Sequence, residues 1–440
     1  MPIRSSLFPP NAPRTIARTA AALIAVASIA ACATDQPAPT GLNATLDASR
    51  GVPFTEDLAS PAWQLVARNL VSAAGLAAVQ ATHVYPILGV AQYLAVQQAE
   101  AALGSPDVES ANSANGVGAG GRLRMETDRG AVAGASAVAM TYLFSASAPT
   151  FEAMVLAQKN VGPGNSGPLL QAFEAGEAIG RAVGAQIVAR AIADHFTDPN
   201  TAVPPVGPGF WTSSAIPPTP VAGGTLPGTT PWFLTSASQF RPAPHPAFGS
   251  APFNAALAEI RQISDNRALH PEQTQIAAFW ALSNGTPTTA GFWLAVPTDS
   301  GWVAQHSLSE RETTHLYALL SATMFDAQIG CWDEKLHSWL IRPWKADLAI
   351  TVVAAVGKPN HPSYPSGHSC LSAAGADVLK TFFPEKSEQL DGMVAQAGLS
   401  RMYGGIHYRF DIAAGQTLGR NVANFTMAAD ASGTSVLTAH

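Results

Sequence analysis

Four long segments that lack the polar and apolar alternation of strands are the feature that most constrains how this chain can fold. They are rich in Ala, Leu, Val and Gln, and they cover residues 65–100, 130–159, 169–195 and 255–284. Ala, Leu and Gln have high helix propensity, so we expect these segments to be helices. The Gly- and Pro-rich stretches at 104–121 and 198–231 predict loops that pack over those helices.

The last third of the chain shows the helical pattern more sharply. We expect helices at 310–341 and 366–383, a third helix ending near residue 402 and a fourth from about 407 to 428. Four such helices make one bundle, and the earlier helices make a second. The predicted fold is therefore all-α, with two packed helical bundles in one continuous domain. The expected parts are an N-terminal bundle with long loops at 56–250, a C-terminal bundle at 251–430 and a tail at 431–440.

The N-terminus carries the features of an export signal in their usual order. Arginines precede an uncharged run at 19–31 that is too short to span a bilayer. The run leads into Cys32 through Ala30 and Ala31, which resembles a bacterial lipoprotein signal, in which the cysteine becomes the lipidated first residue. We expect a signal peptide at 1–31, lipid on Cys32 and a tether at 32–55. An ordinary secretory signal with a chance cysteine is the alternative.

The composition limits which binding partners and which cell compartment we expect. Only 12% of the 440 residues are charged, the net charge is −6 and no basic block stands out, so we expect no nucleic-acid partner. Uncharged stretches at 69–99 and 130–151 are long enough to cross a bilayer, but their Gln, His, Gly and Pro residues favour packed helices of a soluble body. The lipid alone is thus expected to hold the exported protein, on the periplasmic or outer-membrane side of the cell envelope. The sequence leaves a homo-oligomer open.

Only two cysteines, Cys331 and Cys370, lie in the predicted mature chain. Cysteine is therefore not the framework of this fold, even in an oxidising compartment. Two buried free thiols are favoured over a disulfide between them.

The first stretch whose residues are suited to binding or catalysis contains Lys335, Arg342 and Pro343. Lys335 and Arg342 are seven residues apart, which is two turns of a helix, so we expect both cations to leave one helix face. Pro343 disfavours helical geometry at Arg342 and is expected to end the element.

The second and third stretches add a helix start and a pair of histidines. Ser366 is a natural N-cap, so a helix that begins at Gly367 offers free backbone amides to an anion, with His368 at the rim. In the third stretch, glycines after Arg401 let the chain turn back at His407, and Asp411 lies one turn beyond, where its carboxylate can fix the tautomer of that imidazole. Three cations, a helix N-terminus and two facing histidines suit a tetrahedral oxyanion that becomes five-coordinate.

These stretches resemble the complete motif set of the type 2 phosphatidic acid phosphatase (PAP2) and vanadium haloperoxidase superfamily. The matching positions are Lys335-x6-Arg342-Pro343, Pro365-Ser366-Gly367-His368 and Ser400-Arg401-x5-His407-x3-Asp411. The resemblance implies that Lys335, Arg342, Ser366, Gly367 and Arg401 hold the phosphate or vanadate. It makes His407 the nucleophile or vanadium ligand, His368 the acid/base and Asp411 the residue that orients His407.

Context outside the motifs is similar to bacterial haloperoxidase-like proteins, including residues 238–242, 271–274 and 404–411. The resemblance implies a vanadate cofactor and a peroxidase that uses hydrogen peroxide, a halide and a small organic acceptor. His361 stands where bromide-oxidising members carry His, which favours bromide or iodide over chloride and makes His361 a halide-site candidate. A loop histidine without a role is the alternative reading of His361.

Two further functions stay open. One is a phosphomonoester hydrolase that acts on a phosphate ester through a phosphohistidine at His407, in which case no vanadate is needed. The short connection of 31 residues between His368 and Ser400 is more typical of the phosphatases, and Leu340 and Ile341 stand where bacterial haloperoxidases often have aromatic residues. The other is a non-catalytic envelope lipoprotein that retains an anion pocket.

Overall fold

The computed structural model describes residues 58–103, 119–160 and 167–438 of the chain. The predictions for the signal peptide, Cys32 and the tether fall outside these ranges. Within the described residues every regular element is a helix, apart from one isolated bridge between Phe210 and Leu340. The predicted all-α fold class is therefore confirmed. None of the described helices combines the length and hydrophobicity that a membrane span needs.

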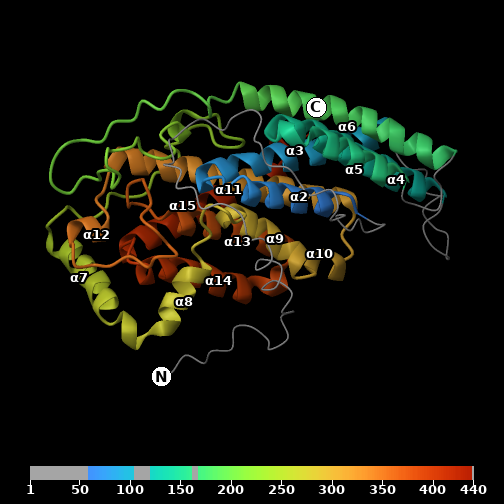
Figure 1. Ribbon diagram of the computed structural model, residues 1–440. Helices are drawn as coiled ribbons and strands as arrows, with labels where there is room; N and C mark the ends of the chain where they lie inside the picture. Colours follow the sequence, from blue (N-terminus) through green and yellow to red (C-terminus); the bar gives the residue numbers. More distant parts are fainter. Residues whose placement is uncertain (1–57, 104–118, 161–166, 439–440) are drawn as a thin grey trace. The chain divides into compact units, whose positions relative to one another are not determined.

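The N-terminal group contains α2 (Ser60–Ala73), α3 (Ala78–Leu103), α4 (Ala119–Leu143), α5 (Ala148–Asn160) and α6 (Pro168–Ile192) (Figure 1). The segment expected at 65–100 is split between α2 and α3, because Gly75 adopts a φ of +61°. The segment at 130–159 is split by the short 3-10 helix η2 (Ser145–Ser147). The sequence pattern thus located the helices but missed two breaks.

Helices α4 and α6 are in backbone contact along a stripe of glycines. A Cβ atom added to Gly176 would lie 1.9 Å from the carbonyl oxygen of Thr127, and one added to Gly180 would lie 2.0 Å from that of Ala131. Only glycine fits at such a distance, so these positions fix how closely the two helices pack.

The central part contains η3 (Leu226–Gly228), α7 (Ala251–Asp265), η4 (Arg267–Leu269), α8 (Pro271–Phe279), α9 (Thr288–Asp299) and α10 (Trp302–Gln305). The single helical segment expected at 255–284 is wrong. The chain leaves α7 at Asn266, and Pro271 starts α8 as its first residue, a position where the missing amide of proline costs nothing. The short helix α8 becomes important for the site.

The C-terminal group contains α11 (Glu310–Ser338), α12 (Pro343–Ala346), α13 (Gly367–Phe382), η5 (Pro384–Lys386), α14 (Ser387–Tyr403) and α15 (Arg409–Ala431). Helix α11 is buried along most of its length and packs against α3 as well as α13 and α15. One hydrophobic core consequently includes residues of both helical groups, as the prediction of one continuous domain required.

The prediction that Lys335 and Arg342 share a helix face is wrong. Helix α11 ends at Ser338, and Trp339 adopts the left-handed conformation with a φ of +50°. Arg342 is extended, with φ −81° and ψ 151°. Pro343 disfavours helical geometry at Arg342 as expected, but the chain had already left the helix four residues before the proline.

Candidate active site

The segment 340–342 carries Arg342 into the site because backbone bonds hold it on two sides. The amide of Ile341 donates to the carbonyl of Gly209 (2.8 Å), and the carbonyl of Leu340 accepts from the amide of Ser363 (2.9 Å). Loops that are far apart in sequence therefore determine where this cation lies. Burial lowers the pKa of Arg342 to about 10.

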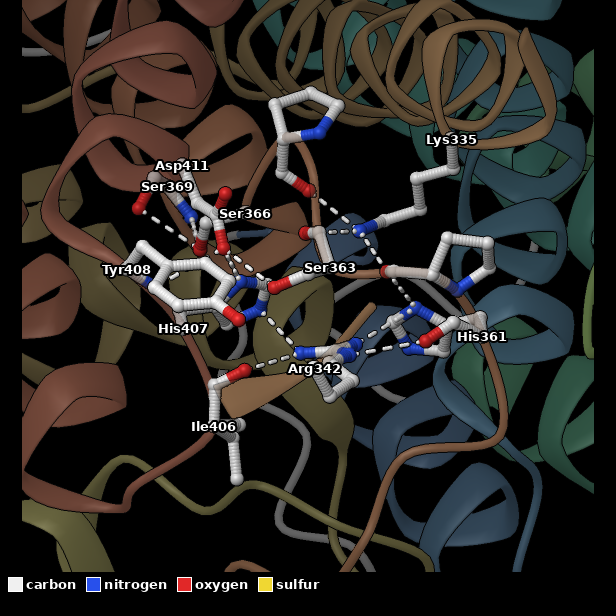
Figure 2. Close-up of polar contacts among 12 residues, drawn as sticks. Lys335, Arg342, His361, Ser363, Ser366, Ser369, Ile406, His407, Tyr408 and Asp411 are labelled. Carbon is white, nitrogen blue, oxygen red and sulfur yellow. Dashed lines mark hydrogen bonds and ion pairs between the residues drawn. The ribbon is translucent and has the colours of Figure 1, made fainter. Parts of the chain in front are cut away.

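The guanidinium of Arg342 connects two histidines (Figure 2). Its Nη1 donates to the carbonyl of Ile406 (2.7 Å) and to Nε2 of His407 (3.0 Å). Its Nε donates to the carbonyl of His361 (3.0 Å), and its Nη2 lies 3.1 Å from Nδ1 of the same residue. Since a guanidinium only donates, both ring nitrogens that it meets must be acceptors.

The tautomer of His407 follows from its two partners. Its Nδ1 lies 2.8 Å from Oδ2 of Asp411, in the first turn of α15, so Nδ1 carries the proton and Nε2 carries the lone pair. The same carboxylate oxygen accepts from Oγ of Ser363 (2.6 Å) and from the amide of Tyr408 (3.1 Å). Burial, Arg342 and Lys335 hold the pKa of His407 well below its ordinary value. His407 is thus a neutral imidazole whose Nε2 lone pair accepts from Arg342 in this structure, and it becomes available as a nucleophile or ligand when that bond breaks.

Lys335 reaches the site from α11 and holds the loop that leads into α13. Its Nζ donates to the backbone carbonyls of Pro362 (2.8 Å), Ser363 (2.9 Å) and Pro365 (2.5 Å). These three bonds use all the donors of an ammonium group, so the direct oxyanion contact expected for Lys335 would need one of them to break. Burial lowers the pKa of Lys335 to about 8.

The N-terminus of α13 offers the predicted backbone donors. Oγ of the N-cap residue Ser366 accepts from the amide of Ser369 (3.4 Å) and from its hydroxyl (3.0 Å). The amides of Gly367 and His368 precede the first helical hydrogen bond, which runs from Cys370 to the carbonyl of Ser366. These two amides and the proton on Ser366 Oγ are suited to an oxyanion.

His368 and Arg401 are both held by the C-terminal end of α8. Nε2 of His368 lies 3.0 Å from the carbonyl of Trp280, and Nη2 of Arg401 donates to the carbonyl of Ala277 (3.3 Å). Nε of Arg401 donates to Oγ of Ser400 (2.8 Å), whereas its Nη1 has no hydrogen bond to any residue that the structure describes. The sequence motifs gave no sign of this role of α8, because backbone carbonyls supply the contacts and any residue type provides one.

Charge interactions connect His368 and Arg401 with Arg342. Burial and the nearby Arg342 lower the pKa of Arg401 to about 9, and burial followed by Arg401 depresses that of His368. Burial raises the pKa of Asp411 to about 6. Lys335 and Arg342 face the carboxylate of Asp411, whereas the buried Arg401 is opposed by the positive charge of Arg342, so an anion would relieve the repulsion among the cations.

His361 completes the group at its edge, with its ring 4.9 Å from that of Trp332. Burial, followed by Lys335 and Arg342, holds the pKa of His361 well below its ordinary value. Direct contacts therefore join Lys335, Arg342 and His407 with the loop 361–366 and with Asp411, whereas the hydrogen bonds of His368 and Arg401 run to the end of α8 and to Ser400. Cys331 and Cys370 are buried free thiols, as favoured from the sequence.

The family model of the PAP2 superfamily matches residues 313–432. The resemblance to this superfamily predicted from the motifs is thereby confirmed for the C-terminal region. No curated protein matches the chain.

Among solved structures, the fold is similar to that of the first bacterial vanadium-dependent iodoperoxidase, with a TM-score of 0.68 and 23% identity over 86% of this chain and 97% of that chain. It is also similar to a bacterial vanadium-dependent chloroperoxidase in its apo form, with a TM-score of 0.60 and 13% identity over 80% of this chain and 93% of that chain. The holo form gives a TM-score of 0.59 and 14% identity over 80% and 92%. These likenesses establish a shared haloperoxidase fold.

Proposed function

We propose that this protein is a vanadate-dependent haloperoxidase that oxidises bromide or iodide with hydrogen peroxide and passes the oxidised halogen to a small organic acceptor. The observation that carries the proposal is the lone pair on Nε2 of His407, held by Asp411 among buried cations. The fold shared with vanadium-dependent haloperoxidases supports it.

The donors of the site fit a vanadate group. His407 would be the ligand through Nε2, and the oxygens would be held by Arg342, Arg401, the hydroxyl of Ser366 and the amide of Gly367. The buried guanidiniums of Arg342 and Arg401 and the free amides at the start of α13 together form a donor set that suits an oxyanion. Bound vanadate would supply a Lewis acid that activates peroxide for halide attack without a change in oxidation state.

His368 has the geometry of a proton carrier. Because its Nε2 donates to the carbonyl of Trp280, the lone pair of the neutral ring is on Nδ1. This nitrogen would accept a proton from incoming peroxide and return it to the leaving oxygen. The positive charge of Lys335 and Arg401 would favour the deprotonated oxygen, and His361 would lie on the halide side.

A phosphomonoester hydrolase is the second candidate. The PAP2 match covers only the C-terminal region, and α13 and α14 are joined by the short turn η5, which keeps the connection from His368 to Ser400 short. In this reading Nε2 of His407 attacks phosphorus, and His368 protonates the leaving alcohol. Vanadate would then compete with the substrate.

One set of assays separates these functions. Bromination of an organic indicator and hydrolysis of an aryl phosphate are each measured with and without vanadate, on the wild-type protein, on His407→Ala and on His337→Ala. His337 is an exposed histidine on the same helix as Lys335 and serves as the matched control. Bromination that requires vanadate and His407 but not His337 supports the proposal. Hydrolysis that vanadate inhibits would replace it with the phosphatase, and the absence of both activities would leave a non-catalytic lipoprotein.

We also propose that the protein is exported and anchored in the cell envelope by lipid on Cys32. The sequence pattern that ends at Cys32 supports this location. Incorporation of a labelled fatty acid tests it, because the label should be lost in Cys32→Ala. Labelling that persists in this variant would contradict it.

A further inference from the structure

The three superfamily motifs do not include helix α8, of which only the start at 271–274 is similar to haloperoxidase-like proteins, yet its C-terminal end holds two residues of the site. The last carbonyls of any helix lack partners within the helix. Here the carbonyl of Ala277 accepts from Arg401, and the carbonyl of the C-cap residue Trp280 accepts from His368, beside the carbonyl of the next residue, Ala281. The orientation of the proposed proton carrier therefore depends on where Trp280 lies.

Trp280 is held in place by one polar contact and by aromatic packing. Its Nε1 donates to Oε1 of Gln396 on α14 (2.9 Å). The buried ring also packs edge-on against Phe292 at a centroid distance of 4.9 Å and lies 6.3 Å from Trp293. The hydrogen bond ties α8 to α14, the helix that carries Arg401 five residues further on.

We propose that Trp280 and Gln396 are positioning residues for His368. The pair fixes the carbonyl of Trp280, and this carbonyl selects the tautomer of His368 with the proton on Nε2 and the lone pair on Nδ1. Without the pair the carbonyl moves, and the ring rotates or shifts its proton to Nδ1, which removes the acceptor that the reaction needs. The catalytic part of this inference rests on the proposed function, but the effect on the tautomer does not.

The test uses two disruptive variants, one rescuing variant and one control. Trp280→Phe removes the donor, Gln396→Leu removes the acceptor, and Gln396→Glu restores an acceptor oxygen. The chain offers a matched control in Trp63, which is buried in α2 and donates from Nε1 to Oε1 of Gln158 (3.0 Å). Trp63→Phe removes the same kind of bond in the N-terminal group of helices.

The first readout is the tautomer of His368 in the vanadate-free protein, taken from the 15N shifts of histidine-labelled samples and assigned with His368→Asn. We expect one tautomer, protonated on Nε2, in the wild type, in Gln396→Glu and in Trp63→Phe. In Gln396→Leu and Trp280→Phe we expect a mixture. Wild-type shifts in both disruptive variants would overturn the proposal, as would an equal change in Trp63→Phe.

The second readout is the kinetics of bromide oxidation by the vanadate-loaded protein. A positioned acid/base group contributes on the order of 10² to 10⁴ in rate, so partial misorientation is expected to lower kcat about tenfold with little change in KM. Gln396→Glu should recover the wild-type kcat. If the tautomer changes as expected but no variant, the wild type included, oxidises bromide, then the positioning role stands and the proposed function fails.

Discussion

The carboxylate of Asp411 provides the sharpest test of the site, through the substitution Asp411→Asn. Oδ2 of Asp411 accepts three hydrogen bonds, at 2.6 Å from Ser363, 2.8 Å from His407 and 3.1 Å from the amide of Tyr408. Asparagine has the same shape but is neutral. If its amide nitrogen faces His407, the imidazole must move its proton to Nε2 and lose the lone pair that the cofactor needs.

The expected magnitude follows from the position of Asp411 behind a ligand. Loss of such a partner typically weakens metal binding about 10- to 100-fold, which is about 1.4 to 2.7 kcal/mol. We therefore expect the Kd for vanadate to rise by that factor in Asp411→Asn. Isothermal titration calorimetry on the vanadate-free protein measures it directly.

The same helix supplies a matched control. Oδ2 of Asp430 lies 2.8 Å from Nε2 of His315, so α15 carries a second histidine–aspartate pair roughly 28 Å along the helix from Asp411. Asp430→Asn should leave the vanadate affinity unchanged. Wild-type affinity in a folded Asp411→Asn protein would refute the role given to Asp411, and an equal loss in both variants would point to a general effect of the substitution.

Three further predictions concern charge, close packing and a buried carboxylate. Because the pKa of Lys335 is about 8 in the anion-free site, Lys335 loses its charge as the pH rises. The affinity for sulfate should therefore fall above pH 8 by up to about tenfold per pH unit. Titrations of Lys335→Gln should show a weaker dependence of the sulfate affinity on pH. Gly180→Ala should lower the free energy of unfolding by about 3 kcal/mol or more, since its Cβ would lie 2.0 Å from a backbone oxygen of α4. Gly392→Ala, which faces open space on α14, should instead raise the free energy of unfolding by about 0.5–1 kcal/mol. Urea denaturation measures both, and equal effects would refute this account of close packing. Asp326→Ala should lower the free energy of unfolding by about 3 kcal/mol or more, because it leaves the two buried amides of Trp232 and Leu234 and the half-buried amide of Phe233 without an acceptor. A loss below about 1 kcal/mol in the same assay would contradict that account.

The helical content of the fold was predictable because composition and periodicity act locally. The breaks between the helices were harder to predict. Gly75 and Asn266 interrupt segments whose residues favour helix throughout, and tertiary packing decides which glycine or asparagine becomes a turn. The end of α11 was equally hard to predict from local sequence, because Trp339 is a bulky residue in a left-handed conformation that its own propensity disfavours.

The site was predictable to the extent that side chains carry its chemistry. The spacing of His407 and Asp411 implied their contact, and Ser366 implied a helix start. The path of Arg342 was not predictable, since loop contacts with Gly209 and Ser363 place it rather than helical periodicity. The role of Trp280 was also hidden, because its contact with His368 is made by the backbone.

This dependence on main-chain oxygens has an evolutionary consequence. The carbonyls of Ala277, Trp280, Ile406 and the loop 361–365 anchor the four charged or titratable groups Arg401, His368, Arg342 and Lys335. A carbonyl survives almost any replacement of its side chain as long as the backbone keeps its path. Apart from Trp280, whose side chain fixes the path of its own carbonyl, mutations can therefore accumulate at these supporting positions without disturbing the groups they anchor, so lineages can diverge widely in residue identity around an unchanged reactive centre.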